Sequence, residues 1–119
     1  VGDGTNCWST VHVTDLAAAY VLAGERAPGG EALNINDGTN PRVGEMVAAI
    51  AAAAGVPGRI RALDPDEAAE KFGPAAEGLG VHQKVANARA VAALGWHPRH
   101  TSFASEADLY LAAYRAHQG

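Results

Sequence analysis

The expected fold depends most on one stretch, Thr10-Val11-His12-Val13-Thr14-Asp15-Leu16-Ala17. Its first four residues are mostly β-branched, which predicts a short strand at 10–13. Either Thr14 or Asp15 can cap a helix at 16–22, because the side-chain oxygens accept amide protons of a first helical turn. This helix is expected to end near Gly24. The stretch therefore predicts a strand that leads directly into a helix.

The rest of the chain continues with short strands and helices. A turn is predicted at Pro28, Gly29 and Gly30, and another at Asp37-Gly38. Alternating patterns predict strands at 32–36 and 59–63, while apolar spacing and cap residues predict helices at 43–54, 64–73, 88–94 and 102–117. Residues 75–83 predict either a loop or a short helix. Short strands with about five helices indicate an α/β fold class, or an α+β-like fragment, in a single domain over 1–119.

Three residue types are expected to set the helix ends. Asn87 is the predicted cap of the helix at 88–94, and Asp64 followed by Pro65 is typical of a helix start. Gly55 and Gly95 are the predicted stops, because glycine readily takes the left-handed conformation that ends many helices.

The composition predicts a thin core. Hydrophobic residues make up 48% of the 119 residues, but 27 of them are alanines, so few apolar side chains are larger than a methyl group. The net charge of -4 is too small to keep the chain expanded. We therefore expect a globular piece that needs a neighbour to cover it.

Composition also excludes several classes of function. The chain has no long apolar run and no basic segment typical of a secretion signal, and its acidic balance opposes a phosphate-binding surface. We expect no membrane and no nucleic-acid partner. Cys7 is the only cysteine, so no intrachain disulfide can form, and a cytoplasmic location is expected. The sequence begins at Val1 rather than Met, which favours a processed chain or a fragment.

The chemically active side chains form no strong motif. His97 and His100 flank Pro98 with no carboxylate nearby, so two solvated histidines are favoured over a metal site. Cys7 and His12 could act as nucleophile and base, but a buried, unreactive cysteine is more common.

Two further sets of residues are open to a structural or a functional interpretation. For His12 and Asp15, a structural cap or hydrogen bond is favoured over proton transfer. Trp96 is expected to pack a corner after a helix. Trp8 can line a pocket, although a core position is more common for tryptophan.

Four motifs stand in series along the chain: 2–17, Leu33-Asn34-Ile35-Asn36-Asp37-Gly38, Val43-Gly44-Glu45 and Leu94-Gly95-Trp96-His97-Pro98. Their order resembles the C-terminal part of extended or atypical short-chain dehydrogenases/reductases, the NAD-dependent epimerase/dehydratase family. The resemblance covers nearly all 119 residues. It implies the substrate-side cap region of a Rossmann-type protein, with 34–37 as a strand that joins the main sheet.

In that family, a Rossmann domain carries a glycine-rich cofactor loop and a Tyr-x-x-x-Lys catalytic pair. Neither is present here, because no lysine stands four positions after Tyr20, Tyr110 or Tyr114. The resemblance therefore implies that this chain alone binds no cofactor and carries no catalytic residue or metal. NAD or NADP is implied for the parent protein. The implied partner is the missing Rossmann cofactor domain or, otherwise, a second copy of the chain.

The resemblance also implies a substrate-binding set, Asn6, Trp8, Ser9 and His12, beside a cleft. Trp8 stands where members that act on nucleotide sugars often carry an arginine for the diphosphate. An indole has no charge to offer a phosphate, so a less charged small-molecule substrate is implied.

The leading interpretation is a substrate-binding C-terminal region of an NAD(P)-dependent epimerase, dehydratase or reductase, inactive alone in hydride transfer. One alternative is a stand-alone binding or self-associating interaction module. Another is a small non-redox cyclase or isomerase that uses the surroundings of Trp8 and His12. Whether the chain is itself an enzyme stays open at this point.

Overall fold

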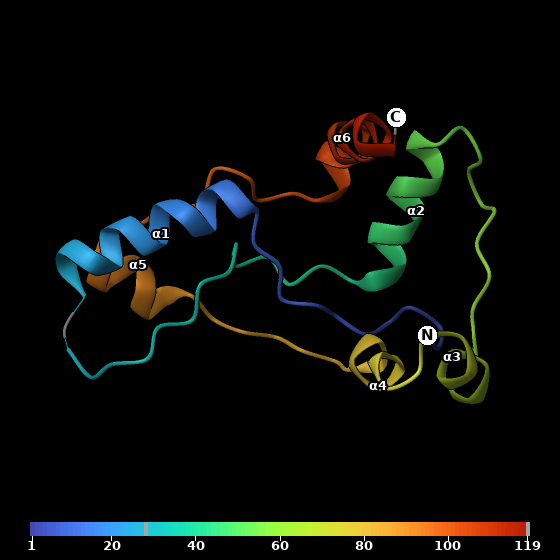
Figure 1. Ribbon diagram of the computed structural model, residues 1–119, viewed down its shortest axis with the longest axis horizontal. Helices are drawn as coiled ribbons and strands as arrows, with labels where there is room; N and C mark the ends of the chain where they lie inside the picture. Colours follow the sequence, from blue (N-terminus) through green and yellow to red (C-terminus); the bar gives the residue numbers. More distant parts are fainter. Residues whose placement is uncertain (28, 119) are drawn as a thin grey trace. The chain divides into compact units, whose positions relative to one another are not determined.

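The computed structural model describes residues 1–27 and 29–118, and its contacts divide this part of the chain into two compact units (Figure 1). Unit one contains residues 1–8, 41–83 and 102 onward, and unit two contains 9–40 and 84–101. Each unit thus joins segments that are far apart in the sequence. A compact unit need not fold alone, so the single domain expected for 1–119 stays a prediction.

The protein is helical. In the described ranges, six α-helices and one 3-10 helix follow in the order α1 Val13–Arg26, α2 Val43–Ala53, α3 Pro65–Phe72, α4 Ala75–Gly80, α5 Ala88–Leu94, η1 Ala104–Glu106 and α6 Ala107–Gln118. Strand-type pairing in 1–27 and 29–118 is limited to one isolated antiparallel bridge, between Cys7 and Arg42. The expected helices are therefore present, but the described residues do not form a clear α/β fold. None of the described helices is long and apolar enough to cross a bilayer.

The three predicted strands, 10–13, 32–36 and 59–63, do not form, and Val13 already belongs to α1. Alternation did mark one inward face, because Leu33 and Ile35 pack against the core of unit two. A strand, however, also needs a ladder of backbone partners. The Asp37 amide donates one bond to the Thr10 carbonyl, at 2.8 Å, and this single bond does not extend into a ladder.

Unit two is held by α1 and α5, which lie side by side (Figure 1). Its core contains Ala19, Ala90, Leu94 and Trp96, each at most 2% exposed. The predicted packing of Trp96 is confirmed. The expected end of α1 near Gly24 is wrong, because the helix continues to Arg26, whose guanidinium donates to the Leu94 carbonyl at 3.0 Å.

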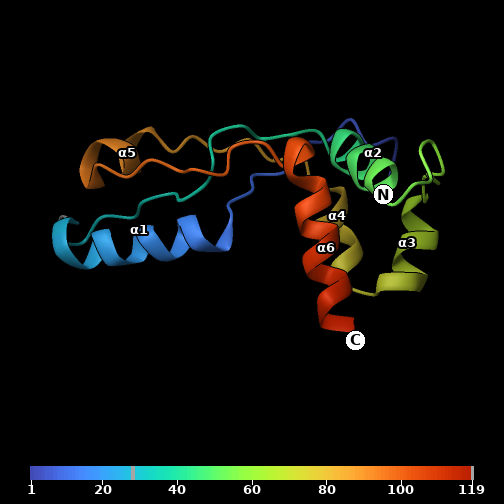
Figure 2. The same cartoon turned by 90° about the horizontal axis from the view of Figure 1, so that it is seen from above.

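Unit one packs α2 against α6 and η1, and α3 against α4 (Figure 2). Its buried apolar side chains are small or medium-sized: Cys7, Val43, Met46, Ala51, Ala68, Ala76 and Ala107. The short helix at 75–80 resolves the open prediction for 75–83. The predicted helices at 43–54 and 88–94 are confirmed to within one residue.

The helix ends match the predicted caps in part. Asp64 accepts the amide protons of Asp66 and Glu67, both at 2.9 Å, which confirms the predicted start of α3. Gly55 and Gly95 both have positive φ after a helix, as expected. Asn87 occupies the cap position of α5 but makes no cap hydrogen bond, so that prediction is wrong. Of the turn predicted at 28–30, Gly29 and Gly30 form a turn, and Pro28 lies outside the described residues.

Unit one also depends on a close approach of two glycines. The Gly44 amide donates to the Gly4 carbonyl at 2.9 Å. A Cβ at Gly4 would lie 2.9 Å from the Gly44 Cα, and Gly4 has a φ of +76°. Gly2 has a similar φ of +72°, but a Cβ there would meet nothing within 4 Å.

We therefore expect Gly4→Ala to destabilise the protein more than Gly2→Ala. Both variants carry the strain of a left-handed alanine, about 1 kcal/mol, and only Gly4→Ala adds a backbone clash, with a further cost of about 1–3 kcal/mol. Urea unfolding of the two variants measures the difference. Equal midpoints would contradict the close packing of Gly4 on α2.

Candidate functional site

The four predicted substrate-side residues are divided between the two units. Asn6 and Trp8 belong to unit one, whereas Ser9 and His12 belong to unit two. Each pair is therefore described within its own unit, and their substrate-binding role stays a prediction. Ser9 is half-buried, and the other three have defined contacts.

Asn6 joins three segments of unit one. Its side-chain amide donates to the carbonyls of Leu79 in the last turn of α4 and of Val81 just after it, at 3.2 and 3.1 Å. Its backbone carbonyl accepts the first amide proton of α2, from Val43, at 2.9 Å. These contacts leave Asn6 with a structural task whatever else it binds.

Trp8 carries an indole N–H that is buried and has no acceptor among the described residues. Its backbone amide is satisfied by the Pro41 carbonyl, at 3.1 Å. An unsatisfied buried donor costs about 1–3 kcal/mol, so such a group in a folded protein needs an explanation. A ligand oxygen or a water molecule could accept this proton.

His12 caps α1, in place of the predicted Thr14 or Asp15. Nδ1 of His12 accepts the Thr14 amide proton at 3.2 Å and lies 2.7 Å from the Thr14 hydroxyl. The ring also stacks on His100, with 3.8 Å between centroids and 21° between planes. The structural interpretation of His12 is thus confirmed. The expectation that His100 is simply solvated is wrong.

Asp15 holds the start of α1 against the segment after α5. Only 4% of Asp15 is exposed, and Oδ2 accepts the amide protons of Arg99 and His100 at 3.0 and 2.9 Å. The indole N–H of Trp96 donates to the Asp15 carbonyl at 2.9 Å. Burial acts to raise the pKa of Asp15, but the two amide bonds and the positive charges of the His100 and His12 rings outweigh it. The pKa of Asp15 is therefore below its usual value.

The polar loop at 36–40, where the sequence predicted a turn, has many side-chain hydrogen bonds that the sequence analysis did not predict. The Asp37 carboxylate accepts bonds from the hydroxyl of Thr10 and from the amide and hydroxyl of Thr39, at 2.6 to 2.8 Å. Asn40 has an unusual positive φ of 47° and makes two bonds to the Val85 backbone. The available signal was the density of Asn, Asp, Thr and Gly at 36–40, which favours side-chain to backbone bonds.

This loop borders a hollow of about 350 Å³ lined by Gly38, Asn40, Lys84 and Asn87, among others. The amide of Asn36, a residue only 3% exposed, has no acceptor among the described residues. Lys84 supplies the one charged side chain in the lining. None of the four predicted substrate-side residues lines this hollow.

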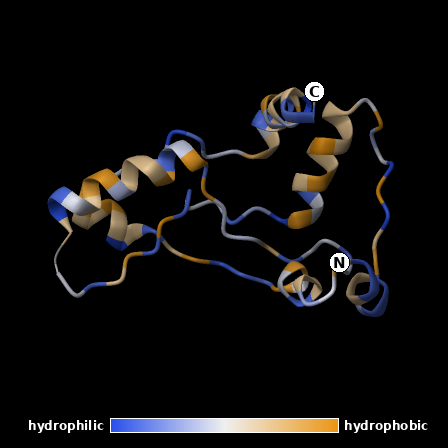
Figure 3. Ribbon diagram, viewed as in Figure 1, coloured by the Kyte–Doolittle hydropathy of each residue, from blue (hydrophilic) through white to orange (hydrophobic). Residues whose placement is uncertain are grey.

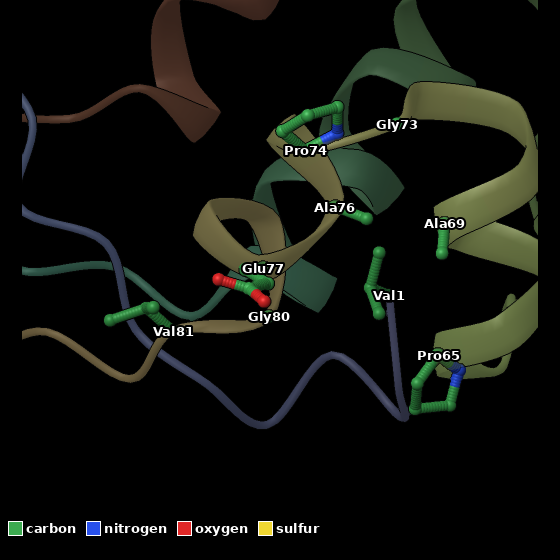
Figure 4. Close-up of a pocket in the computed structure, with 9 residues that line it drawn as sticks. All are labelled: Val1, Pro65, Ala69, Gly73, Pro74, Ala76, Glu77, Gly80 and Val81. Carbon is green, nitrogen blue, oxygen red and sulfur yellow. The ribbon is translucent and has the colours of Figure 1, made fainter.

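Unit one contains a larger, mostly apolar hollow of about 700 Å³ between α3 and α4. Figure 4 shows the Val1 side chain directed between Ala69 and Ala76. Glu77 is the only lining residue with a charged side chain. The hollow offers apolar contact but no arrangement of acid, base or nucleophile.

The proposed nucleophile and metal chemistries find little geometric support. Cys7 is buried, and its amide proton goes to Nδ1 of His82 at 3.3 Å. Nδ1 of His12 is already engaged by Thr14. In the part of the chain that the structure describes, no group of three or more His, Cys, Asp or Glu side chains could hold a metal ion.

Comparison with known proteins gives two partial similarities. The chain is 28% identical over 106 residues to the uncharacterized protein C2A9.02 of Schizosaccharomyces pombe. This match covers 89% of this chain and 35% of that protein. It is 35% identical over 98 residues to a UDP-glucose 4-epimerase of Mycolicibacterium smegmatis, which covers 82% of this chain and 28% of that protein. The chain thus spans about a third of the length of these relatives. No family model matches the sequence, and no solved structure gives a significant match.

The lowered pKa of Asp15 predicts how Asp15→Asn behaves with pH. A carboxyl group with a lower pKa in the folded state stabilises the fold above its unfolded pKa, near 3.9, and this contribution is lost as the pH falls through the folded pKa. We expect Asp15→Asn to lower the free energy of unfolding by about 2 kcal/mol at pH 7, because it weakens two charge-assisted bonds. The deficit should shrink between about pH 5 and pH 2.

Chemical denaturation across this pH range measures that deficit. The exposed Glu70→Gln in α3, outside the first turn of that helix, is the control and should change the free energy of unfolding little. A deficit for Asp15→Asn that stays constant down to pH 2 would show that its charge is not what holds α1.

Proposed function

We propose that the chain is the substrate-binding C-terminal region of an NAD(P)-dependent epimerase, dehydratase or reductase that acts on a small molecule. The observation that carries this proposal is the similarity to UDP-glucose 4-epimerase, which extends over 82% of this chain but only 28% of that enzyme. The remaining length of such an enzyme would supply the Rossmann domain and the NAD or NADP. Alone, the chain would be inactive in hydride transfer. A cytoplasmic location belongs to the same proposal.

The segment 32–36, which forms no strand here, supports the proposal that a partner domain is missing. Leu33 and Ile35 face the core of unit two, and Asn34 is exposed. Backbone N–H and C=O groups that stay unpaired in such a segment are a template for another strand, although the Asn36 carbonyl already accepts a proton from the Asn87 side chain. A sheet in the cofactor domain would pair with this segment and complete the ladder that is absent from the described residues.

The outer surface of α1 supports the same conclusion. Val13, Tyr20 and Val21 are 71%, 72% and 63% exposed, although all three are large and apolar. Figure 3 shows hydrophobic positions along α1, interspersed with hydrophilic ones. Clustered apolar side chains on a surface favour an interaction site, so α1 is a second place where the cofactor domain would dock.

The substrate proposal rests on Trp8. Its buried indole N–H has no acceptor among the described residues, and the indole carries no charge to balance a diphosphate. We therefore favour a small substrate whose recognition uses a neutral oxygen. A substrate-side role for Asn6, Ser9 and His12 belongs to the same proposal, and none of them transfers hydride.

A self-associating module is the second candidate. The same exposed residues of α1 could be covered by another copy of the chain. In that case the protein would bind a ligand or partner without a redox cofactor.

Cofactor titration tests the leading proposal. When NADH or NADPH is titrated with the chain, we expect no saturable change in nicotinamide fluorescence, because the glycine-rich loop is absent from the sequence. Tight, saturable binding would contradict the proposal that this chain has no cofactor site.

Titration with UDP-glucose and with uncharged sugars then compares substrate classes, with Trp8→Phe as the control that removes the indole N–H. A response to UDP-glucose alone would contradict the less charged substrate.

Sedimentation velocity separates the two candidates. If α1 docks on a cofactor domain, the chain should stay monomeric over a wide concentration range. If copies cover each other, it should dimerise, and Val21→Glu should abolish the dimer because it places a charge in an apolar contact. Glu25→Gln on the same helix is a control that should leave the association state unchanged.

A further inference from the structure

The tetrapeptide Asp-Gly-Thr-Asn occurs twice in the chain, beginning at Asp3 and at Asp37. Its local hydrogen bonds are the same in both copies. Oδ1 of Asp3 accepts the amide proton and the hydroxyl proton of Thr5, at 3.0 and 2.7 Å. Oδ1 of Asp37 accepts the same two protons from Thr39, at 2.8 and 2.6 Å. The two copies therefore differ mainly in what the rest of the fold places around them.

Asp-Gly pairs are prone to a spontaneous rearrangement of the backbone, because glycine has no side chain to obstruct it. The glycine nitrogen attacks Cγ of the aspartic acid, a C–N bond forms, and the carboxyl hydroxyl leaves as water with the amide proton. A water molecule then opens the resulting five-membered succinimide ring at either carbonyl carbon. One opening restores aspartate, and the other gives isoaspartate, whose main chain runs through Cβ and Cγ. No oxidant or other reactant is needed.

The surroundings of the first copy leave the reacting groups available. Asp3 is exposed, and its Oδ2 makes no hydrogen bond to residues 1–27 or 29–118. The Gly4 N–H has no acceptor in the same ranges either. The anchors on both sides use other groups, namely the Gly2 N–H, which donates to the Leu63 carbonyl, and the Gly4 C=O, which accepts from Gly44, both at 2.9 Å.

The surroundings of the second copy hold the same groups in place. Asp37 is only 9% exposed, and its Oδ2 accepts the Thr10 hydroxyl proton at 2.7 Å. The Gly38 N–H donates to Oδ1 of Asn36 at 2.8 Å. Attack by the Gly38 nitrogen would break both bonds, so the loop must open before it can react.

We propose that the exposed copy, at Asp3-Gly4, is a site of spontaneous isoaspartate formation, and that the same pair at 37–38 is protected by the bonds around it. Isoaspartate at Asp3 would add one atom to the main chain between the two anchors. Both 2.9 Å bonds cannot then keep their present geometry, so the modified chain releases residues 1–4 from the neighbouring segments of unit one. The inference uses contacts within each unit and does not depend on the proposed function.

Peptide mapping of the aged full chain tests the site. The bonds from the Thr5 hydroxyl and amide hold the pKa of Asp3 below its usual value, and the protonated carboxyl is the reactive form, so the chain is aged in mildly acidic buffer. Trypsin then separates the two copies into peptides 1–26 and 27–42, and electron-transfer fragmentation identifies isoaspartate. We expect at least about tenfold more isoaspartate at Asp3 than at Asp37, because two bonds must break at the second site. In urea the two fractions should become similar.

Equal fractions in the folded chain would overturn the proposal, as would a difference that persists in urea. Thr10→Val removes the hydroxyl bond to Asp37, and it should raise the isoaspartate fraction there about fivefold while Asp3 is unchanged. No rise would overturn the protection assigned to this bond. If Thr10→Val fails to fold, the comparison of folded and urea-treated parent protein still decides. Asp3→Glu is the control that should remove the signal from peptide 1–26, since glutamate closes the larger ring far more slowly.

Amide hydrogen exchange of the isolated isoaspartate form tests the release of residues 1–4. The Gly2 or the Gly44 amide, or both, should exchange about fivefold faster or more than in the unmodified chain, the effect of one lost hydrogen bond. The Gly38 amide, in unit two, is the internal control and should not change. Unchanged exchange of both Gly2 and Gly44 would overturn the predicted release.

Discussion

The buried Asp15 carboxylate is the constraint on which unit two depends. It binds backbone amides 84 and 85 residues away, and the Trp96 indole adds a bond across 81 residues. A buried carboxylate is tolerated only where donors replace water, and charged hydrogen bonds are among the stronger ones available. Because the same residue stands in the first turn of α1, it also meets the positive end of the helix dipole. One side chain thus fixes the start of one helix against the chain that leaves another.

Asparagine side chains link two segments by hydrogen bonds, as backbone groups do in a sheet. Asn40 both donates to and accepts from the Val85 backbone, and Asn87 donates to the Asn36 carbonyl at 2.8 Å. These bonds hold 36–40 against 84–88 much as a ladder holds two strands. The Asn87 bond directs that side chain toward Asn36, and its oxygen accepts no cap bond from α5. These bonds also explain how the polar loop keeps a backbone as unusual as that of Asn40.

Helices could be predicted from the sequence where cap and stop residues act locally, whereas contacts between distant segments could not. Asp64-Pro65, Gly55 and Gly95 act on neighbouring backbone groups, so the sequence around them was sufficient. Alternation at 32–36 identified which side chains face inward, but it carries no information on whether a backbone partner is present. The cap of α1 was expected at Thr14 or Asp15, because histidine is not a usual cap residue. Of the candidate site, the structural role of His12 was predictable, whereas the orphan indole N–H of Trp8 depends on neighbours that no spacing reveals.

Alanine content connects the thin core to the exposed surface. Ala19 of α1 and Ala90 of α5 are at most 1% exposed, and small side chains of this kind let two helices approach closely. Such contacts bury little apolar area. Because each buried Å² contributes only about 25 cal/mol, they add little to stability. Leu22 of α1 also packs against this core, whereas Val13, Tyr20 and Val21 are exposed on the same helix. A helix with buried alanines and exposed large apolar side chains on its outer face is suited to a position between two layers, one of which is α5. In the proposed function, a cofactor domain would supply the other layer.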